Sequence, residues 1–139
     1  MMQATTRFDI ATHGPSLTEF TREVARWLER QGIETGLLTL FCRHTSASLL
    51  IQENASDAVQ QDLLAYFARI APEGRGLYAH DDEGPDDMPA HLRTALTQVS
   101  LSIPVVDGRM VLGTWQGIYL FEHRRGGQRR QVVAHLIGD

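Results

Sequence analysis

The chain has 139 residues and a formal net charge of −4, and all thirteen of its basic side chains are arginine. Without lysine it can neither form a Schiff base with a carbonyl compound nor carry the lysine of a phosphate-binding loop. The mildly acidic balance argues against a nucleic-acid partner held through its phosphates, and the length fits a single domain over residues 1–139.

The sequence also indicates where the protein resides. It carries no apolar run of the roughly 18–20 residues that a membrane span needs, and its first residues lack the layout of a signal peptide. Its one cysteine, Cys42, cannot form an intramolecular disulfide, so the fold does not require an oxidising compartment. We therefore expect a cytoplasmic protein without a membrane partner.

Hydrophobic periodicity and turn residues predict an α+β fold in which helices come early and antiparallel strands come late. The helices are expected over residues 16–32, 56–70 and from 86 or 87 to about 98, and the strands over residues 5–11, 35–44, 47–52, 99–106, 109–112, 114–123 and 129–137. We expect an antiparallel, β-sandwich-like core with these helices packed on one side.

Local signals set the boundaries of several elements. Ser16 and Glu19 have the spacing of a capping box, which predicts the start of the first helix. Residues 35–44 are apolar on both faces, as is typical of a central strand that is covered on both sides. The Asp-Gly pair at 107–108 predicts a tight hairpin, and the Gly-Gly pair at 126–127 predicts a second one.

Several groups of residues could carry chemistry. The six histidines form no local metal motif, so a zinc site would have to be assembled from distant segments. Five acidic residues between Asp81 and Asp87 could hold a hard cation beside His80, or they could form a solvated loop. Glu53 follows an apolar strand, where a general base or a metal ligand is often placed, although helix capping is the simpler role.

Two further features have alternative explanations. Glycines flank Trp115 in the Gly-Thr-Trp-Gln-Gly run at 113–117, which predicts either a bulge with a core tryptophan or the close approach of a ligand or subunit. Cys42 is expected to pack as a small apolar side chain. Apolar central strands and open strand edges need cover in so small a domain, which favours self-association.

Three blocks of residues occur in a fixed order. The first begins with His-Thr-Ser-Ala-Ser at 44–48 and reaches Asn54, the second runs from His80 to His91 and ends in Met-Pro-Ala-His, and the third begins with Gly-Thr-Trp-Gln-Gly at 113–117. In this order and spacing the chain resembles the YjbQ family. The resemblance implies an α+β fold with a β-sandwich core, a homotrimer, and ligand pockets lined by the matched histidines near subunit boundaries.

The resemblance also implies roles for individual residues. The expected ligands of a divalent metal, zinc or magnesium, are His44, His80 and His91; the expected catalytic residues are His44, Glu53 and Asn54; and the expected substrate-binding residues are Thr45, Thr114, Trp115 and Gln116. Many relatives have an Asp-Pro pair after the Glu-Asn block. Here the run is Ala-Ser-Asp at 55–57, so the role of that aspartate is either lost or moved to Asp57.

Family members are known for a weak, secondary thiamine-phosphate synthase activity, which joins hydroxymethylpyrimidine diphosphate to thiazole phosphate and releases diphosphate. A divalent metal or imidazolium groups could neutralise the departing anion. Because the chain has no lysine, arginine is the other strong cation for phosphate, and Arg124 beside the third block is the best-placed candidate. The alternatives are a metal- or metabolite-binding trimer without turnover and a metal-dependent hydrolase of a small phosphorylated substrate.

Overall fold

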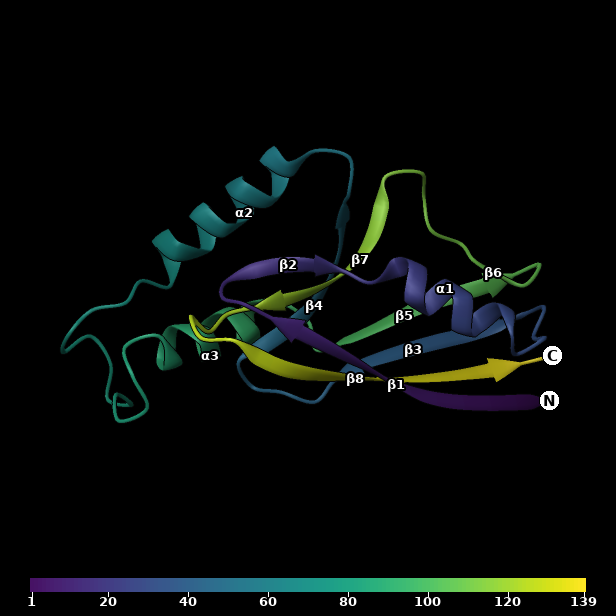
Figure 1. The fold of residues 1–139 in the computed structure, drawn as a ribbon, viewed down its shortest axis with the longest axis horizontal. Helices are drawn as coiled ribbons and strands as arrows, with labels where there is room; N and C mark the ends of the chain where they lie inside the picture. The colour runs from purple at the N-terminus through teal and green to yellow at the C-terminus, as the bar shows by residue number, and fades with distance from the viewer.

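Two antiparallel sheets and three helices make up the computed structural model, which describes residues 1–139 (Figure 1). The five-stranded sheet has the order β1 (Met2–Thr12), β8 (Gln128–Gly138), β3 (Gly36–Cys42), β5 (Ser100–Val106) and β6 (Arg109–Met110). The three-stranded sheet has the order β2 (Ser16–Glu19), β7 (Gln116–Glu122) and β4 (Ala47–Glu53). The helices are α1 (Thr21–Glu29), α2 (Asp57–Ile70) and α3 (Asp87–Leu96). The predicted α+β class is confirmed.

The hydrophobic core lies between the two sheets and is closed by α1. Alternate residues of the long strands point inward, so that Leu38 of β3 stands between Ile103 of β5 and Leu136 of β8, and all three are buried. From α1, Val24 and Trp27 pack into the same cluster. Apolar burial of this kind is the main favourable term in folding, worth about 2 kcal/mol for each large aliphatic side chain.

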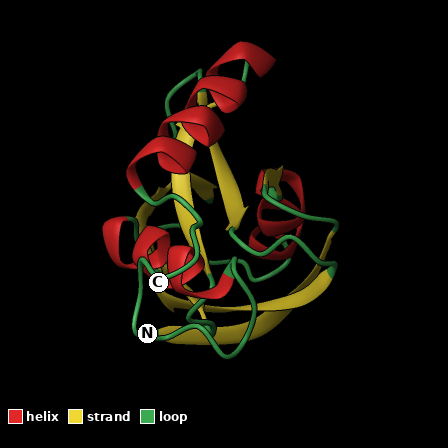
Figure 2. Ribbon diagram, turned by 90° about the vertical axis from the view of Figure 1, so that its left-hand side faces the viewer, coloured by secondary structure: helices red, strands yellow, loops and turns green.

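Helix α2 packs only loosely on the rest of the molecule. None of its residues is buried, and it runs along the outside of the three-stranded sheet (Figure 2). Its half-buried stripe meets β7 through an edge-to-face contact between Phe67 and Phe121, whose ring centroids are 5.3 Å apart. Ser56 caps the start of this helix, because its hydroxyl accepts a hydrogen bond from the Ala58 amide. No helix of the structure is long and apolar enough to cross a membrane.

The first helix begins later than the capping box predicts. Residues 16–19 form β2, which pairs with β7, and the helix starts at Thr21. The Ser16 hydroxyl donates to the Gly14 carbonyl, while the Glu19 carboxylate accepts from the Thr21 hydroxyl. The predicted cap is therefore wrong, because residues 16–19 pair with β7 as a strand instead of capping the helix.

The two hairpin predictions have different outcomes. The Asp-Gly turn is confirmed, since Val106 pairs with Arg109 and both turn residues have positive φ. The Gly-Gly turn at 126–127 joins β7 to β8, but these strands belong to different sheets and do not pair. The second hairpin prediction is wrong because β8 is already paired on both sides, with β1 and with β3.

Strand β3 is central in its sheet but is covered on one face only. Leu37 and Phe41 remain 41% and 48% exposed, whereas the residues that alternate with them are buried. Burial of this strand on both faces is therefore not found within one chain.

A buried ionic network joins the two sheets near the β7–β8 turn. The Glu122 carboxylate, fully buried on β7, accepts hydrogen bonds from Arg130 Nε of β8 at 2.7 Å and from the Thr12 hydroxyl of β1 at 2.6 Å. Burial alone would raise the pKa of Glu122, but the bonds from Arg130 and Thr12 outweigh it and the pKa is lowered. The carboxylate thus stays ionised and fixes one end of β7.

His123 follows this carboxylate and is buried as a neutral side chain. Its Nε2 lies 2.9 Å from the Ser48 hydroxyl, and burial lowers its pKa from 6.5 to about 3. An unfolded chain takes up a proton at this residue below its ordinary pKa, whereas the folded chain does not. The contribution to stability is therefore full above the unfolded pKa and is lost as the pH falls toward the folded pKa.

Because of His123, we expect the free energy of unfolding to decrease by about 2 kcal/mol when the pH is lowered from 7 to 5. In His123→Gln an amide can still bond Ser48 but does not titrate, so this part of the pH dependence should vanish. Urea unfolding of both proteins at the two pH values measures the difference. An equal loss of stability in the variant and in the native chain would contradict a buried, neutral His123.

Candidate functional site

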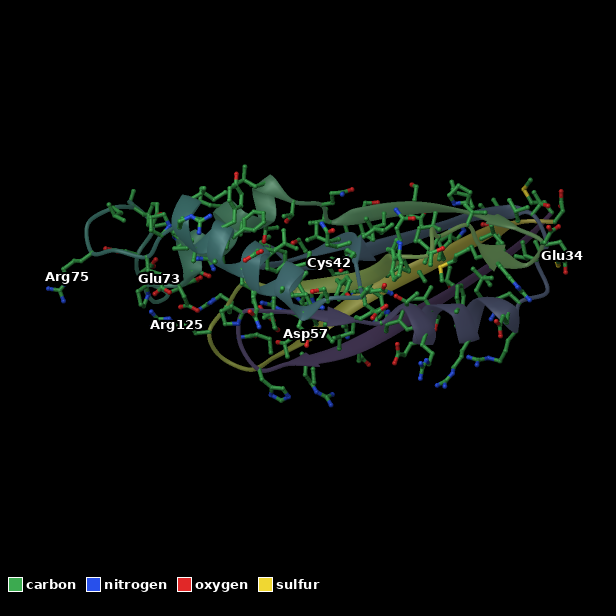
Figure 3. The ribbon with its side chains drawn as sticks, turned by 90° about the horizontal axis from the view of Figure 1, so that it is seen from above. Glu34, Cys42, Asp57, Glu73, Arg75 and Arg125 are labelled. Carbon is green, nitrogen blue, oxygen red and sulfur yellow. The ribbon has the colours of Figure 1, made fainter.

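One end of the molecule gathers three segments that are far apart in the sequence. The loop between α2 and α3, the first turn of α3 and the turn between β7 and β8 lie there, while both termini lie at the other end (Figure 1). Glu73 and Arg125, labelled in Figure 3, lie side by side at this end and form an ion pair, whereas Glu34 marks the opposite end.

Four side chains at this end bring possible metal-ligand atoms within 4.8 Å of one another: His80, Glu83, Asp87 and His91, here called the Asp87 cluster. Asp87 and His91 stand four residues apart on α3 and so share one face of the helix. The loop before α3 folds back and places His80 over the same face. The result is a group of two imidazoles and two carboxylates.

Asp87 is the centre of the cluster. It is only 2% exposed, and its two oxygens have separate partners. Oδ1 accepts from Arg124 Nη1 at 2.8 Å, while Oδ2 lies 2.8 Å from His80 Nε2 and 3.1 Å from His91 Nε2. Burial would raise the pKa of Asp87, but the hydrogen bond from His80 and the nearby charges of His91 and Arg124 outweigh it, and the pKa is lowered.

The orientation of His91 is fixed from both sides. Its Nδ1 lies 2.9 Å from the backbone carbonyl of Thr45, and because a carbonyl can only accept, Nδ1 carries the hydrogen. In the neutral ring Nε2 then has a lone pair, which faces the ionised Oδ2 of Asp87. Such a contact is favourable when the ring is doubly protonated or when a cation lies between the two atoms. A histidine that donates to a carbonyl with one nitrogen is the usual arrangement at metal sites.

Arg124 holds the acidic loop against the start of α3. Besides Asp87, its guanidinium donates to Asp86 Oδ2 at 3.0 Å and to the Glu83 carbonyl at 3.1 Å. The hydrogen bond with Asp86 raises the pKa of Arg124. Asp86 also accepts from the Arg125 backbone amide at 2.8 Å. Arg124 therefore orients the loop and the central carboxylate, and its donors are directed at these groups.

The Asp87 cluster fits a divalent cation by the chemistry of its donors. Imidazole nitrogens suit zinc and other transition metals, whereas magnesium prefers an all-oxygen set. Two histidines and a carboxylate are a known combination of protein ligands for zinc. Asp87 is held in place by Arg124, and His91 is held by the Thr45 carbonyl, so the ligand atoms are positioned before any metal binds.

Comparisons with known proteins agree with the fold and with the motif blocks. Residues 6–139 match the model of the family described as UPF0047 protein YjbQ-like. The chain belongs to this family. It is 51% identical over 130 residues to a UPF0047 protein of Synechocystis, and the matched residues cover 94% of this chain and 88% of that relative. It is 48% identical over 107 residues to the UPF0047 protein YjbQ of Salmonella typhimurium, with 77% of each chain covered.

Solved structures give the same result for this YjbQ-family chain. A hypothetical protein from Aeropyrum pernix has a TM-score of 0.90 at 30% identity, covering 98% of this chain and 99% of that one. A conserved hypothetical protein from Thermus thermophilus has a TM-score of 0.84 at 36% identity, covering 95% and 99%. The family match and these structures establish the family and the fold, and neither assigns an activity.

The predicted histidines divide between two places. His80 and His91 belong to the Asp87 cluster, whereas His44 does not. The Nε2 atom of His44 accepts a hydrogen bond of 2.9 Å from the backbone amide of Gln131, and His44 lines a neighbouring cavity together with Thr45. Burial lowers the pKa of His44, which keeps it neutral. The structure therefore does not bring His44 to the group that it was predicted to share with His80 and His91.

The other predicted residues lie at the far end of β4 and β7. These strands pair from Ala47 with Glu122 to Glu53 with Gln116, so the ends of seven-residue strands are separated by about 20 Å. The carboxylate of Glu53 accepts from the amides that precede α2, and the amide of Asn54 donates to Glu19.

Thr114 and Trp115 form a turn at the same end, and Gln116 begins β7. Thr114 is exposed, Trp115 is 63% exposed, and the Gln116 side chain accepts from the Gly113 amide at 2.8 Å. Trp115 is therefore not core filler. The roles predicted for these residues and for Glu53 and Asn54 stay predictions, and within one chain they do not meet the Asp87 cluster.

The sequence did not single out Asp87 and Glu83 as ligands, although both fall in the acidic loop that it offered as a cation site. We expected a zinc site to combine distant segments, whereas the Asp87 cluster lies within residues 80–91. The available signal was the four-residue spacing of Asp87 and His91 on a helix. A search for paired histidines misses it because one member of the pair is a carboxylate.

Replacing Arg124 with glutamine should loosen the acidic loop, because Asp86, Asp87 and the Glu83 carbonyl would lose their shared charged donor. We expect backbone amides of residues 84–90 to exchange with solvent about tenfold faster or more, as measured by hydrogen exchange. Arg129→Gln, at an exposed arginine in the next strand, is the matched control. Equal protection in both variants would show that Arg124 does not hold the loop.

Proposed function

We propose that this YjbQ-family protein binds a divalent cation of the zinc type in the Asp87 cluster and, through that cation, the phosphate group of a small molecule. The contact between His91 Nε2 and Asp87 Oδ2 supports the proposal most directly. The two atoms lie 3.1 Å apart, in the neutral imidazole they would present lone pairs to each other, and both residues are fixed from behind by other hydrogen bonds. A bound cation satisfies both atoms at once.

The charge around the cluster makes phosphate binding depend on the cation. Asp82 and Glu83 lie within 3.8 Å of His80 nitrogens, and Asp81 adjoins them in the loop. A phosphate entering this end would be repelled by these carboxylates. The donors of Arg124 are already directed at Asp86, Asp87 and the Glu83 carbonyl. A divalent ion would reverse the local sign of charge, so binding of the metal should precede binding of the phosphate.

Thiamine-phosphate synthesis is one reaction that such a site can support. The bond between the pyrimidine methylene carbon and the diphosphate oxygen breaks, diphosphate leaves with the electron pair, and the thiazole nitrogen forms the new carbon–nitrogen bond. A bound metal would supply charge neutralisation for the departing diphosphate. Asp87 and His91 would hold that metal, and Arg124 would keep both the loop and Asp87 in place. We propose this activity as a secondary one.

A binding protein without turnover is the second candidate, and one observation favours it. Glu53 and Asn54, the residues predicted to act as catalytic groups, lie at the end of β4 opposite Ala47, and the two ends of the strand are about 20 Å apart. Turnover would then need either the cluster alone or residues from another copy of the chain. The proposed homotrimer would meet that need if its subunits placed these two ends together.

Metal binding tests the proposal first. Titration of the metal-free protein with zinc chloride in a calorimeter should show one site per chain, and His80→Ala and His91→Ala should each weaken it by about 100-fold or more. His135→Ala is the matched control, because His135 bonds only Gln3 on the outer face of β8. Zinc binding that persists in both cluster variants would place the metal elsewhere.

Pyrophosphate binding tests the order of events. We expect no measurable binding to the metal-free protein and clear binding once zinc is present, because only the cation offsets the carboxylates of the loop. Calorimetry with and without zinc distinguishes the two cases, and His91→Ala should lose both ligands. Binding of pyrophosphate to the metal-free chain would contradict the proposed dependence.

Turnover separates the two candidate functions. With hydroxymethylpyrimidine diphosphate and thiazole phosphate as substrates, zinc-loaded native protein and His135→Ala should form thiamine phosphate, and His91→Ala should not. Zinc and pyrophosphate binding without any product would favour the binding protein.

A further inference from the structure

We propose that Arg130 is a positioning residue for the Asp87 cluster. Through its buried ion pair with Glu122, it fixes the two backbone segments on which the orientation of His91 and of Asp87 depends. This inference rests on the proposed function, because it concerns the metal affinity of that site. Arg130 makes no hydrogen bond to a member of the cluster and so acts only through other residues.

One branch of this network leads to His91. Arg130 Nη2 donates to the Ser46 backbone carbonyl at 3.2 Å and to the Ser46 hydroxyl at 2.9 Å. The carbonyl of the preceding residue, Thr45, accepts from His91 Nδ1 at 2.9 Å. Thr45 is exposed and lies before the start of β4. The bonds from Arg130 to Ser46 therefore fix the direction of the carbonyl that orients His91.

The other branch leads to Asp87. Glu122 Oε1 accepts from Arg130 Nε at 2.7 Å, and Glu122 Oε2 bonds Nη2 of the same guanidinium. Oε2 also accepts from the Arg124 backbone amide at 3.1 Å, and the Arg124 side chain donates to Asp87 Oδ1 at 2.8 Å. The planar fork of one guanidinium thus orients both Ser46 and Glu122. A single side chain sets two candidate metal ligands relative to each other.

Stability alone does not account for this ion pair. Arg130 is only 5% exposed and Glu122 is fully buried, and the loss of hydration of two such charges offsets most of their attraction. An apolar pair of similar volume is often equally stable or more stable. The charged pair provides what an apolar pair cannot, namely directed hydrogen bonds to both segments that hold His91 and Asp87.

Arg130→Lys separates positioning from stability. Lysine keeps a positive charge beside Glu122 but lacks the fork that also reaches Ser46. We expect the zinc affinity, measured by calorimetry, to fall about tenfold or more, as is typical when groups that orient metal ligands are lost. In the metal-free protein, the Nδ1 hydrogen of His91 should exchange faster with solvent, so that its imidazole signal in the NMR spectrum broadens.

Val24→Ala is the matched control for stability, because it opens the core beneath α1 and leaves the ion pair in place. It should lower the free energy of unfolding yet keep the native zinc affinity and the native His91 signal. Ser46→Ala is the second variant should Arg130→Lys fail to fold. It removes only the hydroxyl acceptor, and we expect it to weaken zinc binding about threefold.

The outcomes distinguish this inference from the proposed function. If Arg130→Lys keeps the native zinc affinity and the native His91 signal, or if Val24→Ala loses both equally, Arg130 is not a positioning residue and the metal proposal stands. If the native chain binds no zinc, both proposals are overturned. A loss of affinity and of the His91 signal in Arg130→Lys, with both kept in Val24→Ala, supports the inference.

Discussion

The buried carboxylate of Asp87 is the interaction on which the functional end of the molecule depends. Arg124 binds one of its oxygens, and His80 and His91 share the other. These partners come from the β7–β8 turn, the loop before α3 and α3 itself, so one side chain joins three segments. Removing one partner of a buried charge strongly destabilises the fold. The arrangement of the loop and that of the helix therefore depend on each other.

The core of the protein supports this carboxylate through Glu122. The Glu122 side chain is held by Arg130, and its Oε2 accepts from the backbone amides of His123 and Arg124 at 3.0 and 3.1 Å. The backbone at Arg124 is thus fixed by a carboxylate that lies between the two sheets. Because Arg124 in turn orients Asp87, the position of the candidate ligands follows from a buried network that lies outside the site.

The sequence predicted the fold class, the family and most elements, but long-range pairing lay beyond it. Residues 16–19 carry a helix-capping pattern but form a strand, because β7 provides a partner. The sequence also predicted that the strands now seen as β7 and β8 form a hairpin, whereas β8 pairs with β1 and β3. His80 and His91 were identified from their motif. The separation of His44 from them could not be predicted, because it depends on the Gln131 amide from a strand 87 residues away.

A zinc-edge anomalous diffraction map of crystals grown with zinc would test the central claim most directly. We predict one strong peak per chain in contact with His80 Nε2, His91 Nε2 and a carboxylate oxygen of Asp87 or Glu83. A peak at His44, or no peak within reach of Asp87 in crystals that contain zinc elsewhere, would contradict the account.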